Sequence, residues 1–175
     1  GTQEIFYDDP RVLYVSWHQS PHYPNTGRAT ECGTARSLGT TINVPLPRGA
    51  TGEHYRYAPE VLVAPAVEAF EPDWMLVSAG FDSHRADPLC DLSLSSGDIA
   101  DITSDLSALV APGRLAALLE GGYDLDALAD CSAAMVAAIG GVKLHPEAPT
   151  SGGPGRKFVE AAVEARTRAL DEGVA

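Results

Sequence analysis

The stretch Ala79-Gly80-Phe81-Asp82-Ser83-His84-Arg85-Ala86-Asp87-Pro88 decides the fold of this chain. It follows an apolar run, residues 74–78, that is too short for a helix and predicts a buried strand of a parallel sheet. Ligands of open α/β sheets bind at the carboxyl ends of the strands, which is where Asp82 falls. The two carboxylates of Asp82 and Asp87 suit a metal or a proton relay. The alternative is that Asp82 caps the loop and Asp87 is a turn residue before Pro88.

Strand and helix patterns alternate on both sides of this stretch. Residues 11–17 and 40–46 predict strands, and 114–119 fits strand or helix, with the Glu120-Gly121-Gly122 break favouring a strand. Helical patterns are expected at residues 3–6, with Thr2 as the cap, and at 53–70, 97–110, 124–140 and 157–170. This alternation predicts an α/β fold with a mostly parallel sheet covered by helices.

Two details of these helices can be predicted more closely. Within 53–70 we expect the helix to start near Pro59 and to bend at Pro65, because proline in a helix interior removes a hydrogen bond. The helix at 97–110 should be capped by Ser95 or Ser96, with Asp98 in its first turn.

Three breaks in the pattern should meet at one edge of the sheet, because the strands before them are parallel. They are residues 18–27, 80–88 and 121–124. Loops that follow parallel strands and carry polar residues are commonly functional. We therefore expect five side chains to lie within reach of a single crevice: Asp82, Tyr123, Tyr23, His18 and His22.

Tyr123 follows two glycines, which lack a Cβ and let the backbone approach a ligand closely. Its hydroxyl could donate a hydrogen bond to an oxyanion, and the alternative is a loop tyrosine that packs its ring and leaves its hydroxyl in water. His84 stands two residues after Asp82, a spacing that could bind a metal because alternate residues of an extended strand end point the same way.

The remaining histidines are expected to have no catalytic role. We expect His18 to support the fold through a backbone hydrogen bond and His22 to lie on the loop surface. His54 and His145 sit in polar sequence and should be solvated.

Length and composition exclude several classes of protein. At 175 residues the chain can form one domain with a core, and no apolar run approaches the length of a membrane helix. The net charge of −12 argues against a nucleic-acid surface. The three cysteines, Cys32, Cys90 and Cys131, form no CxxC pair, so neither a disulfide framework nor a cysteine zinc site is expected, and the cytoplasm is the simplest setting.

Four segments together resemble one family. They are VSWHQSPHYPNTG at 15–27, NVPLP at 43–47, GFDSHRADPL at 80–89 and EGGYDL at 120–125. In this order and at these separations they resemble the zinc-dependent histone deacetylases, whose relatives include acetylpolyamine amidohydrolases and acetoin-utilisation proteins. The likeness runs from Gly1 to about Gly141 and implies the arginase/deacetylase-like fold.

The resemblance implies a role for each matching position at the expected reaction centre. Asp82 matches a carboxylate ligand of the catalytic zinc, and Tyr123 matches the tyrosine that polarises the amide carbonyl. His84 becomes a neighbour of the site and not a ligand. The residues that match the tunnel for the acylated amine and the floor of the pocket are Tyr23, Gly121, Gly122 and Leu89.

The same resemblance implies two sites for monovalent cations. Ser16 and the carbonyl of Trp17 match a potassium site beside the zinc. Residues Phe6, Asp9 and Val12 match a second site built mostly from backbone carbonyls.

The departures from the family pattern are as informative as the matches. The family's other zinc ligands lie in an Asp-x-His motif just before the residues that match Gly1, and its histidine base lies further upstream. Because catalytic zinc needs about three protein ligands, Asp82 alone should not hold it. We therefore expect the C-terminal part of a deacetylase, incomplete at its N-terminal side, inactive alone, and with an apolar sheet edge exposed.

The resemblance also suggests how the chain is divided. Residues 1–142 would be the C-terminal portion of the deacetylase-like domain, and 143–175 a linker and a terminal amphipathic helix. The expected partners are an acetylated amine substrate and the missing N-terminal half, with neither nucleic acid nor membrane. Two rival hypotheses remain: a non-catalytic α/β binding module or pseudoenzyme, and a different metal hydrolase that uses Asp82, His84 and Asp87.

Overall fold

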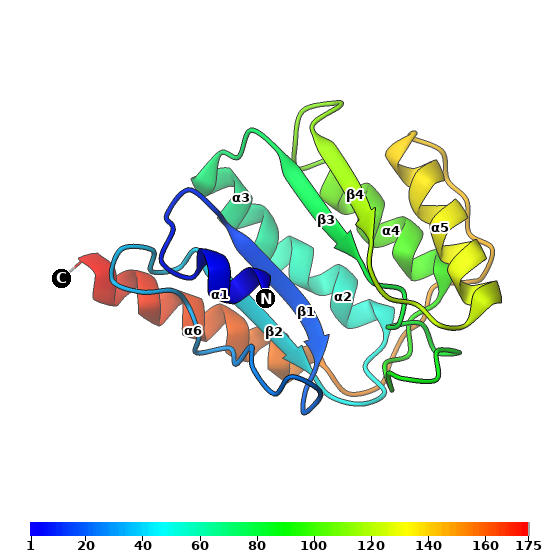
Figure 1. The fold of residues 1–175 in the computed structure, drawn as a ribbon, viewed down its shortest axis with the longest axis horizontal. Helices are drawn as coiled ribbons and strands as arrows, with labels where there is room; N and C mark the ends of the chain where they lie inside the picture. Colours follow the sequence, from blue (N-terminus) through cyan, green and yellow to red (C-terminus); the bar gives the residue numbers. More distant parts are fainter. Residues whose placement is uncertain (175) are drawn as a thin grey trace.

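Four parallel strands form two separate pairs in the computed structural model, which describes residues 1–174. In each pair the strands run in register, with Tyr14 opposite Thr41 and Met75 opposite Leu115. All four strands point the same way, so their carboxyl ends lie along one edge (Figure 1). The first pair joins β1 (Tyr14–Gln19) to β2 (Thr41–Leu46), and the second joins β3 (Met75–Ala79) to β4 (Leu115–Leu119).

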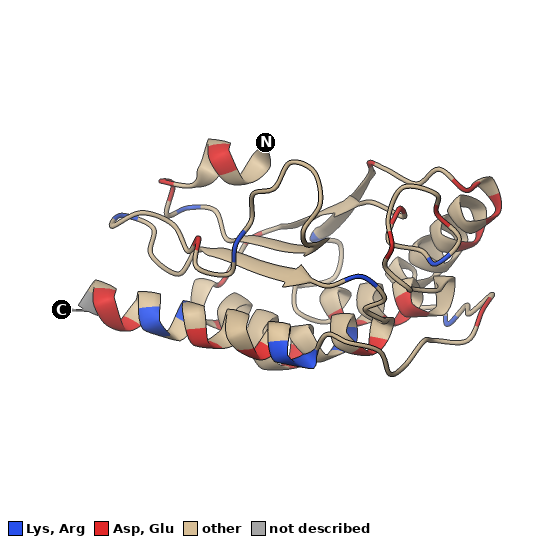
Figure 2. Cartoon of the chain, turned by 90° about the horizontal axis from the view of Figure 1, so that it is seen from below, with Lys and Arg blue, Asp and Glu red and all other residues tan. Residues whose placement is uncertain are grey.

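Most of the helices cover one face of the strands. The short helix α1 lies on the opposite side from α6, as Figure 2 shows, and acidic and basic residues are interspersed along α6. The helices are α1 (Thr2–Phe6), α2 (Gly52–Ala58), the π-helical turn η1 (Pro59–Val63), α3 (Ala64–Phe70), α4 (Ser96–Ser107), α5 (Leu125–Ile139) and α6 (Arg156–Val174). No helix within residues 1–174 combines the length and apolar content that crossing a membrane requires.

The terminal helix α6 packs against β2 in the core. Val44 and Leu46 of β2 are fully buried, and so is Val159 of α6. All three belong to one apolar cluster that also includes residues of α2 and α4. The terminal helix therefore shares the core of the sheet.

A wide cavity separates β1 from β3. It has a volume of about 1330 Å³ and is lined by every residue of both strands. Within the described chain each of these strands has a hydrogen-bonded neighbour on one side only. The edges that face the cavity thus carry backbone donors and acceptors without a strand partner.

The outer face of the sheet is exposed, which corrects one expectation and confirms another. The strand after Asp73 was expected to be buried, but burial alternates along β3 and Leu76 is 70% exposed. The reason is that the helices of this chain cover only one face of β3. The predicted exposed apolar edge is confirmed on β4, where Leu118 and Leu119 are both exposed.

The helix expected to start near Pro59 begins earlier. It starts at Gly52 and passes through a π-helical turn at Pro59, where the amide of Ala64 donates to the carbonyl of Pro59. Pro59 has no amide hydrogen, so the irregularity falls there. The predicted bend at Pro65 is wrong in position, because Pro65 lies in the first turn of α3.

The first turn of α4 is capped as the sequence predicts, by Ser95. The Ser95 hydroxyl accepts from the amide of Asp98, and the Asp98 carboxylate accepts from the amide of Ser95 at 2.9 Å. Asp98 is fully buried and also accepts from the Thr150 hydroxyl at 2.6 Å and pairs with Arg56. One carboxylate therefore joins α2, α4 and the irregular segment after α5.

Replacing Asp98 with alanine should strongly destabilise the protein. Asp98→Ala removes the α4 cap and leaves the partly buried Arg56 without its ion pair. We expect the free energy of unfolding in urea at pH 7 to fall by about 3–5 kcal/mol. Asp105→Ala, at an exposed position of the same helix, is the control and should change it by no more than about 0.5 kcal/mol. Equal losses in the two variants would contradict the role given to Asp98.

Candidate active site

Two loops meet where β3 and β4 end. The amide of Glu120 donates to the carbonyl of Ala79 at 3.1 Å, and the amide of Phe81 donates to the carbonyl of Gly121 at 2.9 Å. These bonds continue the pairing of the two strands beyond their last residues. Residues 80–88 and 121–124 are therefore neighbours, as the sequence predicts.

Asp82 and Tyr123 both lie close to Gly121. A Cβ placed on Gly121 would stand 3.3 Å from Oδ1 of Asp82 and 3.7 Å from Cε2 of the Tyr123 ring. The predicted proximity of this carboxylate and this phenol is thus confirmed. Any larger residue at Gly121 would crowd the space between them.

The Asp82 carboxylate is partly buried and has an unfavourable electrostatic environment. Burial raises its pKa above the usual aspartate value, and the nearby Asp87 carboxylate raises it further, while its own amide and His22 oppose the shift. Among residues 1–174 no side-chain donor forms a hydrogen bond with it. A carboxylate in this condition is a site that a cation would stabilise.

The described residues do not complete a zinc site. Catalytic zinc takes about three protein ligands. No group of three histidine, cysteine, aspartate or glutamate side chains within residues 1–174 could hold a metal ion. Asp82 fits as one ligand, and the others would have to come from elsewhere.

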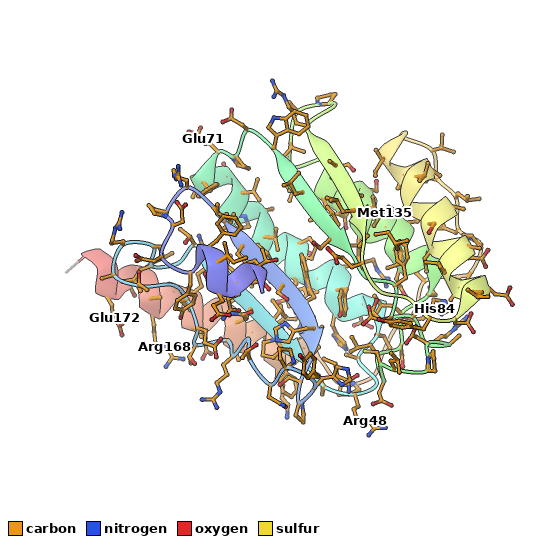
Figure 3. The ribbon with its side chains drawn as sticks, in the orientation of Figure 1. Arg48, Glu71, His84, Met135, Arg168 and Glu172 are labelled. Carbon is orange, nitrogen blue, oxygen red and sulfur yellow. The ribbon has the colours of Figure 1, made fainter. Side chains whose placement is uncertain are left out.

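His84 is buried and both of its ring nitrogens are engaged. Nε2 donates to Glu147 at 2.7 Å, and Nδ1 accepts from the Ala86 amide at 3.2 Å. Figure 3 places His84 in the loop beyond the carboxyl end of β3. The hypothesis of a metal site made from Asp82, His84 and Asp87 is therefore wrong for this arrangement.

Asp87 is also fully engaged. Its Oδ1 accepts from the Leu89 amide at 2.9 Å, which agrees with the turn alternative, and its Oδ2 accepts from the Tyr123 amide at 2.7 Å. The bond to Tyr123 was not predicted, and local spacing offers no signal for it. Glu147 was missed as well, because it lies in a Pro/Gly-rich segment that resembles a plain linker.

The other histidines divide between confirmed and corrected expectations. His18 supports the fold, since Nε2 lies 2.9 Å from the carbonyl of Gly27 and Nδ1 lies 3.0 Å from the Ser16 hydroxyl, and burial lowers its pKa. His22 is exposed, as expected.

The expectation for His54 is wrong, because His54 is buried. It lies beneath residues 152–153, and its Nε2 faces their carbonyls. His145 is exposed and lies 2.9 Å from Asp101.

The expected tunnel residues follow the carboxyl ends of the strands and form no enclosed wall among residues 1–174. Tyr23 is 88% exposed, Leu89 is 56% exposed and Tyr123 is 57% exposed. Gly122 has a φ of +131°, a conformation that residues with a Cβ rarely adopt. The substrate roles of Tyr23, Gly121, Gly122 and Leu89 stay predictions.

The two expected cation sites also stay predictions. At the first cation site, the Ser16 hydroxyl is hydrogen-bonded to the His18 ring, and Trp17 is the next residue of β1. At the second, the carbonyls of Phe6 and Asp9 accept from the amides of Asp9 and Val12 at 3.0 and 3.3 Å. The Asp9 carboxylate is held by Arg11, which leaves backbone carbonyls as the available ligands there.

Comparison with known proteins gives a consistent result. Residues 1–139 match the model of the histone deacetylase domain. The chain is 42% identical over 148 residues to a probable deacetylase of Archaeoglobus fulgidus, covering 82% of this chain and 41% of that protein. The solved HDA15 HD domain superposes with a TM-score of 0.84 at 31% identity, covering 99% of this chain and 49% of that one.

A second solved structure gives the same outcome. The histone deacetylase Clr3 superposes with a TM-score of 0.85 at 34% identity, covering 98% of this chain and 29% of that one. The chain thus spans less than half the length of these relatives, and its fold is that of the arginase/deacetylase class.

Glu147 should stabilise the protein in a pH-dependent way. Partial burial alone would raise its pKa, but hydrogen bonds from His84, the Ser96 amide and Arg85 outweigh it and lower the pKa to about 2. Because the folded pKa lies below the unfolded value of 4.5, the stabilisation is present above pH 4.5 and is lost as the pH falls towards 2.

We expect Glu147→Gln to lower the free energy of unfolding at pH 7 by about 1–3 kcal/mol, and the difference from wild type to shrink below pH 4.5. Urea titrations across this pH range measure it. Glu160→Gln, which removes only an exposed pair with Arg156, should cost about 0.5 kcal/mol or less. A loss at Glu147 that does not change with pH would argue against the ionic explanation.

Proposed function

Because the chain belongs to the histone deacetylase family, we propose that it forms the C-terminal part of a zinc-dependent deacetylase. The complete enzyme would hydrolyse the amide of acetyl-lysine or of an acetylated polyamine-like amine, with acetate and a free amine as products. The observation that carries this proposal is the placement of both the Asp82 carboxylate and the Tyr123 ring against the Cβ position of Gly121.

Each of the two side chains suits one task in amide hydrolysis. The phenol of Tyr123 is exposed and could donate a hydrogen bond to the carbonyl oxygen as negative charge develops there. Asp82 would be one carboxylate ligand of the zinc. When bound, zinc polarises a carbonyl and lowers the pKa of a bound water.

We propose that the remaining zinc ligands and the histidine base come from the portion of the relatives that this chain does not cover. The cavity between β1 and β3 supports this, because both strands present unpaired edges to it. Its apolar lining and the exposed Leu118 and Leu119 are surfaces that further strands could cover. The covering portion could be continuous with the chain or belong to a partner chain.

The acidic composition fits a cationic substrate, although it does not choose between the two classes of amine. At a net charge of −12 the protein would attract a polyamine or a lysine-rich peptide over long range, in a salt-dependent way. Potassium would bind near Ser16 and Trp17, and a second monovalent cation near Phe6, Asp9 and Val12. The described cysteines are all free, which suits the reducing cytoplasm proposed for the enzyme.

A non-catalytic binding module is the competing function. It would use the same edge of the sheet, with Asp82 and Tyr123 as structural residues. The lack of a side-chain donor to the Asp82 carboxylate among residues 1–174 favours the enzyme, since a structural aspartate normally has donors that satisfy its carboxylate.

Removal of the Tyr123 hydroxyl should lower the turnover rate of the complete enzyme. We expect Tyr123→Phe to reduce kcat by about a hundred- to a thousandfold with little change in KM, because the lost donor acts in the transition state. Steady-state kinetics on an acetyl-lysine peptide and on an acetylated polyamine measure this. Tyr57→Phe, on α2, is the matched control and should retain wild-type kcat. Unchanged turnover in Tyr123→Phe would exclude the assigned role.

This chain alone should not turn over substrate, because Asp82 is the one zinc ligand proposed among residues 1–174. We expect zinc affinity and activity to appear when the chain is combined with the uncovered portion, and Asp82→Ala to abolish both. Zinc titration by calorimetry separates the two functions. A binding module would be indifferent to zinc in every combination.

A further inference from the structure

Asp87 is a buried carboxylate that joins the two loops of the site. It is 8% exposed, and it accepts one bond from Leu89 within its own loop and one from Tyr123, 36 residues further along the chain. Both donors are backbone amides. A turn before Pro88 would need only the first of them.

Tyr123 has few other restraints. Its hydroxyl forms no hydrogen bond within residues 1–174, and its side chain is more than half exposed. The preceding Gly122, at a φ of +131°, adds no side chain that could pack. The position of the phenol therefore depends on how the backbone of Tyr123 is held, and the Asp87 carboxylate holds its amide at 2.7 Å.

The loop that carries Asp87 is itself anchored by backbone hydrogen bonds. The amide of Arg85 donates to the carbonyl of Leu94, and the amide of Leu94 donates to the carbonyl of Ser83. Between them, His84 is fixed from outside the loop by Glu147. Asp87 is therefore attached to a fixed support that also carries Asp82.

We propose that Asp87 is a positioning residue, which sets the place of the Tyr123 phenol relative to the Asp82 carboxylate by accepting the hydrogen bond of the Tyr123 amide. This inference rests on the proposed function. Asp87 touches neither substrate nor metal in this role. A displacement of about 1 Å in a reacting group can lower a rate by about a hundredfold, so the restraint bears directly on turnover.

The test combines kinetics with amide hydrogen exchange in the complete enzyme. In Asp87→Ala we expect the Tyr123 and Leu89 amides to exchange at least about tenfold faster. The amides of β2 should be unaffected. We expect kcat to fall by about ten- to a hundredfold while KM changes by less than about twofold. Asp126→Asn removes the same charge three residues from Tyr123, at an exposed position, and should match wild type in both measurements.

A double-mutant cycle separates positioning from a general loss of structure. If Asp87 acts through the Tyr123 hydroxyl, Asp87→Ala should cost far less in the Tyr123→Phe background than in wild type. Asp87→Asn, which keeps the shape but only one acceptor, gives the same cycle should the alanine variant not fold. Full additivity, or a loss expressed in KM alone, would overturn the inference.

The exchange measurement tests the hydrogen bond between Asp87 and Tyr123 independently of the proposed function. If the wild-type protein proves inactive, fast exchange of the Tyr123 amide in Asp87→Ala still supports the link between the loops. If that amide exchanges at the wild-type rate, the inference fails even in an active enzyme.

Discussion

The backbone hydrogen bond from Phe81 to Gly121 is the contact on which the site depends. At 2.9 Å it carries the pairing of β3 and β4 one step past the ends of the strands. Asp82 follows the donor and Tyr123 comes two residues after the acceptor, so one bond brings both functional groups to the same place. Parallel pairing makes this possible, because it puts two carboxyl ends side by side (Figure 1).

The exposed apolar surfaces follow from the same sheet. Helices of this chain cover one face of β3 and leave Leu76 on the other, and β1 and β3 stand apart across the cavity. Apolar groups and strand edges of this kind are normally covered in a stable protein. The family relatives are at least twice as long as the part that matches this chain. Both facts favour a larger unit in which the second half completes sheet and site together.

The sequence could predict what depends on local pattern. The four short apolar runs gave the strands, and the glycine breaks after 79 and 120 gave the edge where Asp82 and Tyr123 meet. The cap at Ser95 could be predicted too, because it depends only on residues close together in the sequence. The start of the helix at Gly52 was missed because Pro59 suggested a later start, whereas a π-helical turn accommodates Pro59.

Partners far apart in the sequence could not be predicted in this way. Glu147 lies 63 residues from His84, and Thr150 lies 52 from Asp98. Spacing reports which residues share a helix face or a strand face, but not which loop will fold back against another. His54 was misjudged for this reason, since the glycines that bury it lie about a hundred residues later.

The acidic side chains around the site differ in how far their carboxylates are already satisfied by hydrogen bonds. Glu147 is satisfied by His84, Arg85 and Ser96, and Asp87 by two backbone amides. Asp82 has no such side-chain donor among residues 1–174, and burial and Asp87 together raise its pKa. A cation that approaches this edge would therefore gain most at Asp82, because the neighbouring carboxylates already have their hydrogen bonds. Asp82 is therefore the carboxylate that the proposed zinc would bind.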